Sequence, residues 1–513
     1  MRAFIVTAAL IAPLAFTATV CRGQAVPAER ADEARIDRLL SQLTLEEKMQ
    51  LIRGGSEDAS VDQGQAGYLP GVPRLGIPSL RMADGPPGLL TRVPSQAETA
   101  TMGVAATFSV QDAEANGLVI GREARSLGID VVLQPFVNID RDITFARGFN
   151  TFGEDPLLTG AMGAAEIRGI QSQSVMAQVK HFVAYDSDSY DIFVDQQTLH
   201  EIYAAPFADA VKAGVSSIMC SYNRVNGAYA CGNSDTLQTL LKGELGFKGF
   251  VTSDWGAVHN VNFINQGLDM EMPGSLDRGP LAAFSHSYFR TSALASAAPP
   301  KLDPDMLAGM LGGTLPEEPA STFDMLSFPT DSDSKTMRDA FQDGTVKEAT
   351  ITAAARRVLY EMDRFGYLDG KQKHTITAHA IEANAAVIQK TAEDAAVLLK
   401  DEGAALPLTS ADLQSLALIG PGSQQVTSIG TFGERSSGLT QRQISPLDAL
   451  KKLAPQAHIT SAVDDDMTGS PIEAERLSHG GDPGPDRAPV THGPQLCTQP
   501  GRQQVLAPLR YRG

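Results

Sequence analysis

Short apolar runs alternate with amphipathic stretches from the first third of the chain to about residue 272. The runs are rich in Val and Ile and are too short for helices; they cover residues 77–82, 129–133, 175–179, 215–219 and 249–252. The stretches between them have apolar residues at helical spacing, as in 113–127, 157–170 and 199–213. This alternation predicts βαβ units around a parallel sheet, and the unbroken apolar runs predict strands buried on both faces.

The fold class predicted by this pattern is α/β, with a closed (β/α)8 TIM-like barrel as the catalytic domain over residues 30–365. Before the first strand, Ile36, Leu39 and Leu40 fall on one helical face, and Thr44 with Glu47 forms a capping box for a second helix. Residues 275–335 lack a steady period and are expected to form a long surface loop within the barrel.

The second half of the chain has a weaker pattern. We expect a linker at 366–380 and an α/β sandwich domain at 381–472, with a helix at 381–399, a strand at 416–419 and a helix at 446–453. This stretch is short for such a domain, so we expect the domain to be incomplete. Apolar periodicity ends at about Ile472, which indicates a truncation or a shifted reading frame, and residues 473–513 are predicted to be a disordered tail.

The N-terminus has the pattern of an export signal. Arg2 is followed by an apolar stretch over 4–20, and Gly23-Gln24-Ala25 fits a cleavage site, which predicts a signal peptide at 1–25. The alternative is an uncleaved anchor; after cleavage no membrane association is expected. The predicted location is the periplasm or the medium. In such an oxidising compartment Cys220 and Cys231 either form a disulfide or remain two buried thiols, and the sequence leaves both open.

Composition and the absence of known motifs disfavour several classes of binding partner and cofactor. The net charge of -18 disfavours nucleic acid as a partner, because an acidic surface repels phosphates. The 4 cysteines lack zinc-site spacing, and there is no P-loop, G-x-S-x-G or H-E-x-x-H motif. We therefore expect neither a metal nor another cofactor.

Polar side chains follow each predicted strand, where parallel α/β folds build their sites. In chain order they include Asp84, Arg147, Lys180-His181, Tyr222 and Asp254-Trp255. Carboxylates in a sequence without a metal-binding motif favour glycoside cleavage, because an ionised aspartate can attack an anomeric carbon. Lys180 and Arg147 would keep Asp84 and Asp254 charged.

At these positions the sequence resembles glycoside hydrolase family 3, in particular its β-glucosidases, from about Leu43 to Ala462. The motifs are ADGPPG at 83–88, Arg147 ahead of FGEDP at 152–156, KHF at 180–182, MCSYN at 219–223 and SDW at 253–255. Thr144-Phe145-Ala146 departs from the family's usual approach to its arginine.

The resemblance implies a role for each matching residue. Asp254 matches the nucleophile, and Asp84 matches the carboxylate that binds hydroxyls far from the anomeric carbon. The others match cationic donors to sugar hydroxyls (Arg147, Lys180, His181), a side chain beside the nucleophile (Tyr222) and apolar walls (Met219, Trp255). Two structural alternatives stay open: Asp254 as a helix N-cap, and Arg147 paired only with Glu154 or Asp155.

Two functions follow from the resemblance. The first is an exported, exo-acting, retaining β-glucosidase that removes terminal β-D-glucosyl residues from β-linked oligosaccharides or glycosides. The family's general acid/base is commonly a Glu of the second domain, and no residue of this chain matches it. The second is therefore a truncated relative that binds sugars but is catalytically impaired.

Overall fold

The structure is a computed structural model that describes residues 31–274, 336–372, 381–402, 406–409, 415–423 and 444–462, apart from gaps at 59, 86–87, 92, 94, 143–144, 146 and 188–190. The predicted signal peptide, the predicted loop at 275–335 and the predicted tail at 473–513 lie outside the described residues. Within the described ranges, no helix has the length and apolar character needed to cross a bilayer.

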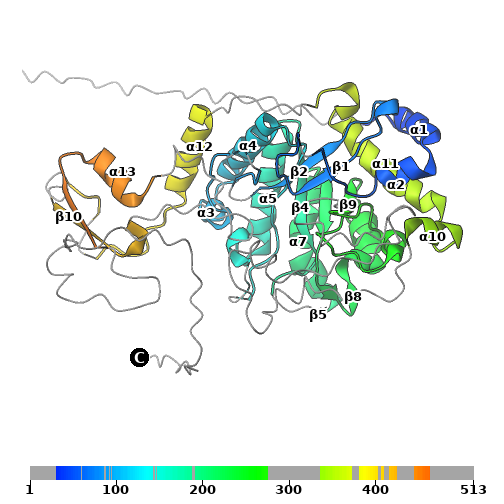
Figure 1. The fold of residues 1–513 in the computed structure, drawn as a ribbon. Coiled ribbons are helices and arrows are strands. Elements are labelled where there is room, and N and C mark those ends of the chain that lie inside the picture. The colour runs from blue at the N-terminus through cyan, green and yellow to red at the C-terminus, as the bar shows by residue number, and fades with distance from the viewer. Residues whose placement is uncertain are drawn as a thin grey trace, which may run out of the picture.

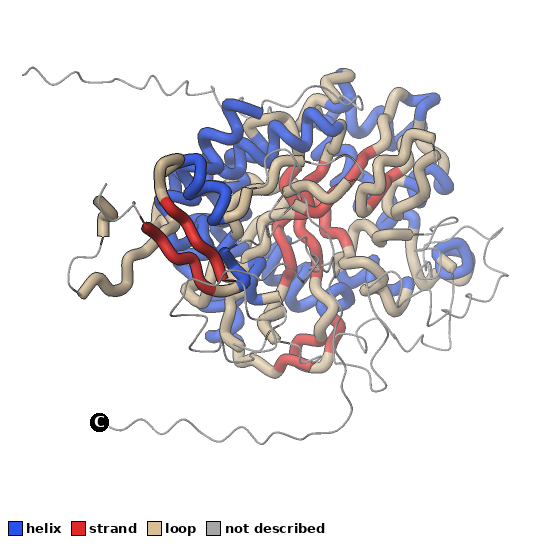
Figure 2. Tube along the Cα trace, turned by 60° about the vertical axis from the view of Figure 1, so that its left-hand side comes forward, coloured by secondary structure: helices blue, strands red, loops and turns tan. Residues whose placement is uncertain are grey.

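A curled six-stranded sheet forms the centre of the molecule (Figures 1 and 2), in the order β1-β2-β3-β4-β6-β9. Its strands are β1 (Gly67–Leu69), β2 (Leu80–Asp84), β3 (Val131–Leu133), β4 (Met176–Phe182), β6 (Ser217–Cys220) and β9 (Phe250–Thr252). The strands from β2 onward are parallel, and all five overlap the predicted apolar runs. β4 is buried along its whole length, as an unbroken apolar run requires.

Two extended segments outside the named strands connect the edges of this sheet. Met270 bridges to Thr252 of β9, and Glu271 bridges to Arg53. The amide of Gly55 then donates to the carbonyl of Tyr68 in β1. The TIM-like α/β architecture is thus present, but the described residues do not form the eight regular parallel strands that we expected. β1 runs antiparallel to β2. The isolated bridges at Thr252–Met270 and Arg53–Glu271 link β9 back toward β1 in place of regular strands.

Helices cover the outside of the sheet (Figure 2). The main ones are α4 (Val110–Leu127), α5 (Pro156–Gln171), α7 (Ala205–Lys212) and α11 (Glu348–Arg364). α4 and α5 approach closely at glycines, since a Cβ on Gly117 would lie 2.2 Å from the carbonyl oxygen of Glu166. The helix predicted at 199–213 is divided into η3 (Leu199–Tyr203) and α7, where Pro206 near the start of α7 has no amide hydrogen for a continuous helix.

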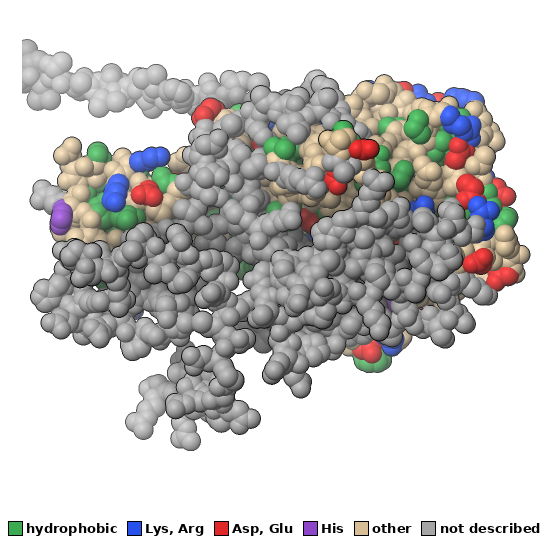
Figure 3. Space-filling model, viewed as in Figure 1, with side chains coloured by type: hydrophobic (Ala, Val, Ile, Leu, Met, Phe, Trp, Pro, Cys, Tyr) green, Lys and Arg blue, Asp and Glu red, His purple; other side chains and the backbone are tan. Residues whose placement is uncertain are grey.

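The two ends of this α/β region meet through α1 (Glu33–Gln42), α2 (Leu45–Gln50), α10 (Met337–Gln342) and α11. The predicted capping box of Thr44 and Glu47 is confirmed. α1 packs against α11, and charged side chains of both signs gather over these helices at the right of Figure 3. They form ion pairs such as Arg35–Asp363, Arg356–Glu33 and Arg338–Glu46. Segments about 300 residues apart in the sequence are tied together here.

Several short elements complete the α/β region. They are η1 (Pro73–Leu75), α3 (Thr101–Ala106), η2 (Gly148–Asn150), β5 (Asp191–Ile192), α6 (Gln196–Thr198), β7 (Arg224–Val225), β8 (Ala228–Tyr229), η4 (Ala230–Gly232), η5 (Asp235–Glu244), η6 (Val261–Gln266) and η8 (Tyr367–Asp369). β5, β7 and β8 form a separate small sheet.

The later part of the chain begins with α12 (Ile381–Asp394), which ends earlier than the predicted helix at 381–399. α12 packs against α3 and α4, and Asn384 Nδ2 donates to Glu123 Oε1 over 2.8 Å. Beyond it, the parallel strands β10 (Ser415–Ile419) and β11 (His458–Ala462) pair, with η10 (Pro421–Ser423) and α13 (Pro446–Leu453) between them along the chain. The predicted domain boundaries stay predictions.

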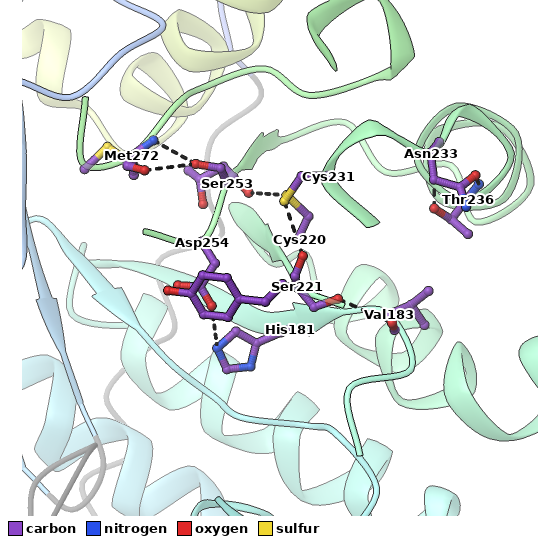
Figure 4. The surroundings of a disulfide bond; sticks show 12 residues. His181, Val183, Cys220, Ser221, Cys231, Asn233, Thr236, Ser253, Asp254 and Met272 are labelled. Carbon is purple, nitrogen blue, oxygen red and sulfur yellow. Dashed lines mark hydrogen bonds and ion pairs between the residues drawn. A yellow bond between two sulfur atoms is a disulfide. The ribbon is translucent and has the colours of Figure 1, made fainter. Parts of the chain in front are cut away.

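A disulfide joins Cys220, at the end of β6, to Cys231 in η4 (Figure 4). It closes a loop with a sequence separation of 11. This resolves the alternative that the sequence left open in favour of the disulfide. The bond holds the segment that carries Tyr222 next to the end of the sheet.

Removal of this disulfide should destabilise the protein. We expect Cys220→Ser with Cys231→Ser to lower the free energy of unfolding by about 2–3 kcal/mol, because the reduced unfolded chain has more conformational freedom. Urea unfolding with and without a reductant measures the effect. The prediction fails if the reductant shifts the midpoint of the wild type no more than that of the double variant.

Candidate active site

The residues predicted at strand ends lie at one end of the sheet. Asp84 ends β2, Lys180 and His181 belong to β4, Tyr222 follows β6, and Asp254 follows β9. In Figure 4, Asp254 and His181 point toward each other, close to the disulfide. Parallel strands place their carboxyl ends on one edge, which is why residues far apart in the sequence meet here.

Lys180, which is buried, forms an ion pair with Asp84, which is partly exposed. Lys180 Nζ lies 2.6 Å from Asp84 Oδ1, and the two side chains are 3% and 16% exposed. A charged pair so far from water is expensive to break, because removing one partner leaves the other charge unpaired. The pair therefore fixes both groups on adjacent sides of the site.

His181 lies between Arg147 and Asp254. Its Nε2 is 3.3 Å from Arg147 Nη1 and 3.3 Å from Asp254 Oδ2. The Arg147 guanidinium also stacks over the ring of Phe136, 4.9 Å from its centroid. Arg147 therefore contacts the site, as the resemblance implied.

The folded surroundings of His181 act on its charge. Burial, and then the neighbouring Arg147 and Lys180 cations, lower the pKa of His181 well below its ordinary value. This shift favours a neutral imidazole, and the predicted role of His181 as a donor to sugar hydroxyls stays a prediction. The sequence could not show this, because the effect comes from burial and from charges brought together by folding.

Asp254 is buried, with a side chain only 8% exposed. Its Oδ1 accepts the Trp255 amide over 2.7 Å, and the residue starts a turn closed by the Ala257 amide, not a helix. The N-cap alternative is therefore not what the structure shows. Nearby, the hydroxyl of Ser253 bonds both the amide and the carbonyl of Met272, which anchors the end of β9 (Figure 4).

The surroundings act on the ionisation of Asp254 in opposite directions. Burial raises its pKa, while Arg147, Lys180, the Trp255 amide and the Tyr222 hydroxyl lower it, and the net shift is upward. Among the described residues, the groups in hydrogen-bond or ion-pair contact with Asp254 are Trp255, His181 and Tyr222. None of these is a carboxylic acid.

Tyr222 and Trp255 form one wall beside Asp254. The Tyr222 hydroxyl donates to the Trp255 carbonyl over 3.0 Å, and burial followed by the Asp254 charge raises its pKa well above the ordinary value. The indole of Trp255 donates to the carbonyl of Ala66 over 3.0 Å and is half-buried. Met219 is buried in β6 as part of the hydrophobic core, and its role in a sugar pocket stays a prediction.

Asn138 is a residue that the strand-end analysis missed. It is 3% exposed, and its side chain bonds both the carbonyl and the amide of His181. Asn138 follows β3, as the predicted polar residues follow their strands. Its position after an apolar run was a usable signal, but an uncharged amide among apolar neighbours is more often structural.

The arrangement suits a neutral, polyhydroxylated ligand. Lys180 and Arg147 supply donors, Asp84 and Asp254 supply acceptors, and Trp255 supplies an apolar face. Among the described residues, no group of three or more His, Cys, Asp or Glu side chains is placed to hold a metal ion. Fold and site together define an α/β domain with a buried carboxylate among polar side chains at the carboxyl end of its sheet.

Comparison with known proteins identifies the family. Residues 65–279 match the sequence profile of the Glycosyl hydrolase family 3 N terminal domain. A beta-glucosidase of Rhizobium radiobacter is 32% identical over 438 residues, which are 82% of this chain and 45% of the relative. A probable beta-glucosidase A of Aspergillus flavus is 42% identical over 257 residues, which are 46% of this chain and 30% of the relative.

A solved structure is similar over most of the chain. DesR, a beta-glucosidase from Streptomyces venezuelae in complex with D-glucose, superposes with a TM-score of 0.69 at 33% identity, over 86% of this chain and 51% of that one. The chain thus belongs to glycoside hydrolase family 3 and is β-glucosidase-like. It spans about half the length, or less, of the relatives it matches.

Removal of the Lys180 charge should change the pH dependence of any turnover. We expect Lys180→Gln to raise the pKa of Asp254 further, because Lys180 is one of the cations that lower it. If Asp254 is the predicted nucleophile, which acts when deprotonated, the acidic limb of the kcat/KM profile should move to higher pH. Lys242→Gln is the control, as it removes a buried lysine that pairs with Asp269 instead. An unmoved limb in Lys180→Gln would contradict the electrostatic role.

Proposed function

We propose that this chain cleaves terminal β-D-glucosyl residues from glycosides with net retention, with Asp254 as the nucleophile. The observation that carries the proposal is the position of the Asp254 carboxylate. It is buried, which raises its pKa, Arg147 and Lys180 favour its charged form against that effect, and its Oδ2 accepts no hydrogen bond within the described part of the chain. An oxygen in this state is available to attack a carbon centre.

The reaction has two steps. Asp254 Oδ2 attacks the anomeric carbon, the bond to the leaving oxygen breaks, and a glycosyl ester forms. Water then attacks the same carbon from the opposite face and releases Asp254, so the product keeps the β configuration. The proton that the water loses balances the leaving oxygen, which departs as an anion from an activated substrate and is otherwise protonated by the general acid. Asp84, Lys180 and Arg147 hold sugar hydroxyls during both steps and orient the ring over Asp254.

Binding of one terminal sugar is supported by the ion pair of Asp84 and Lys180, which supplies both an acceptor and a donor beside the nucleophile. Tyr222 and Trp255 add the wall on the other side. The D-glucose present in the DesR structure supports glucose as the sugar. The disulfide supports an exported, periplasmic or secreted location, because such bonds persist in oxidising compartments.

A second candidate function rests on the general acid/base, since no residue of this chain matches the family's glutamate. In a retaining glycosidase this acid is a separate group about 5 Å from the nucleophile and protonates the leaving oxygen. On this proposal the chain binds β-glucosides but turns over only those with good leaving groups at an appreciable rate. Both candidates share the same nucleophile and differ in the acid.

The configuration of the first product tests the shared part. A nuclear magnetic resonance time course with 2,4-dinitrophenyl β-D-glucoside is expected to show β-glucose first, followed by slow mutarotation. The α-anomeric substrate serves as the control and should not react. Initial formation of α-glucose from the β substrate would refute a covalent route through Asp254.

A further inference from the structure

Asn138 contacts three polar atoms of His181. Its Nδ2 donates to the His181 carbonyl over 2.8 Å, and its Oδ1 accepts the His181 amide over 2.8 Å. The same Oδ1 lies 3.2 Å from His181 Nδ1. Both residues are buried, at 3% and 1% exposed.

These contacts fix the direction of each hydrogen bond. A carbonyl oxygen can only accept, so the atom facing the His181 carbonyl is the Asn138 amide nitrogen. A peptide amide can only donate, so the atom facing it is the Asn138 oxygen. Because this oxygen cannot donate, the His181 Nδ1 that faces it carries the hydrogen.

The other side of the ring meets both a donor and an acceptor. A neutral imidazole has one N–H, so with the hydrogen on Nδ1 the Nε2 atom carries a lone pair. Arg147 Nη1 can only donate and lies 3.3 Å from Nε2, which fits this lone pair, whereas ionised Asp254 Oδ2 at the same distance would fit an Nε2–H. The contact of Nδ1 with Asn138 therefore decides the tautomer.

We propose that Asn138 is a positioning residue that holds His181 in the Nδ1–H tautomer, so that Nε2 faces Asp254 as a hydrogen-bond acceptor. The proposal deepens the proposed function and rests on it, since it concerns the group beside the nucleophile. In this tautomer His181 cannot donate to Asp254 Oδ2, which lies 3.3 Å away. The attacking oxygen therefore receives no hydrogen bond from His181, and the Nε2 lone pair accepts from the Arg147 guanidinium.

The opposite tautomer would change the site. An Nε2–H would donate to the Asp254 carboxylate and stabilise its charged form, which lowers both its pKa and its reactivity. With Nε2 as an acceptor, a hydrogen bond between the two groups forms only when Asp254 itself carries the proton. The tautomer thus sets how readily Asp254 ionises.

The charged and titratable groups around the pair favour a neutral ring. Arg147 approaches from the segment after β3, and Lys180 lies on β4 next to His181 and pairs with Asp84. The rings of Tyr185 and Tyr222 complete the surroundings, with the Tyr185 centroid 5.3 Å from that of His181. The Asp254 carboxylate beside Nε2 favours a positive ring, but burial and the two cations outweigh it and disfavour an imidazolium here.

Nuclear magnetic resonance of the wild-type full chain tests the tautomer directly. In protein labelled with ¹⁵N-histidine, long-range ¹H–¹⁵N spectra separate protonated from unprotonated ring nitrogens, and a His181→Gln sample identifies the signals. We expect Nδ1 of His181 to be protonated and Nε2 to be unprotonated between pH 6 and 8. A protonated Nε2, alone or as imidazolium, would overturn the proposal whether or not the chain is active.

Variants test the part played by Asn138. Asn138→Leu removes the contact that holds the ring, so we expect a signal from Nε2–H. The acidic limb of the kcat/KM profile should move to lower pH. On an activated aryl glucoside, kcat should fall about tenfold, which is the scale of one hydrogen bond to a charged group. Asn138→Asp keeps an acceptor for Nδ1–H and should keep that proton in place. Asn233→Leu removes another buried amide, away from His181, and should change neither readout.

Each outcome decides a separate question. If Asn138→Leu keeps the wild-type tautomer and limb, Asn138 has no positioning role. If Asn138→Leu does not fold, Asn138→Ala, which also removes the acceptor at position 138, decides whether Nδ1–H depends on it. If no variant, nor the wild type, turns over any glucoside, the proposed function fails, while the tautomer is still decided by the spectra.

Discussion

Asp254→Asn is expected to lower kcat on an activated aryl β-glucoside by about 10⁴-fold or more, the scale on which loss of a nucleophile acts in covalent catalysis. The substitution is nearly isosteric, and the new amide oxygen can still accept the Trp255 amide. The sugar contacts of Asp84, Lys180 and Arg147 remain. Binding of glucose, measured by calorimetry, should therefore change only a few-fold while turnover is lost.

Asp130→Asn is the matched control for this experiment. Asp130 is also buried, but it accepts the Arg81 amide just before β3, at the opposite end of the sheet. We expect this variant to lose stability without losing turnover per folded molecule. If both variants retain activity, or if both lose it equally when corrected for folded fraction, the nucleophile is not Asp254.

The leaving group should have the second largest effect. No residue of this chain matches the family's general acid, and loss of general acid catalysis costs about 10²–10⁴-fold on leaving groups that need a proton. We therefore expect 2,4-dinitrophenyl β-glucoside to be cleaved far faster than an unactivated β-linked glucose disaccharide. Rates for the disaccharide within tenfold of the aryl substrate would refute the impaired candidate and leave the full β-glucosidase.

Azide separates the two steps of this reaction. If no base assists water, the glycosyl ester accumulates, and azide, which needs no base, should speed turnover and give β-glucosyl azide. In Asp254→Asn, azide could only replace the missing carboxylate and would give the α product. The absence of any azide effect on the wild-type chain would contradict a missing base.

Much of the α/β region follows from local sequence. The apolar runs at 129–133 and 249–252 predict β3 and β9. A strand that is buried on both faces has apolar residues at successive positions instead of alternating apolar and polar ones. The capping box of Thr44 and Glu47 involves only neighbouring residues and forms as predicted. The placing of Asp84 and Asp254 on one edge follows from the parallel topology.

Other features depend on contacts between distant segments. The bridge from Arg53 to Glu271 needs a close approach, since a Cβ on Gly54 would lie 2.1 Å from the carbonyl oxygen of Pro273, and no local pattern shows it. The neutral state of His181 arises from burial beside two cations, and the role of Asn138 from a partner 43 residues away. Such effects arise from contacts in the folded chain, and the spacing of apolar residues along the sequence does not predict them.

The most direct measurement of the central claim is covalent trapping of the nucleophile. 2,4-Dinitrophenyl 2-deoxy-2-fluoro-β-D-glucoside forms its glycosyl ester quickly and releases it slowly, so the labelled residue can be mapped by peptide mass spectrometry. We predict one label per chain, on Asp254, with none in Asp254→Asn. A label on Asp84 or on any other carboxylate, together with continued turnover, would contradict the assignment of Asp254 as the group that attacks the sugar.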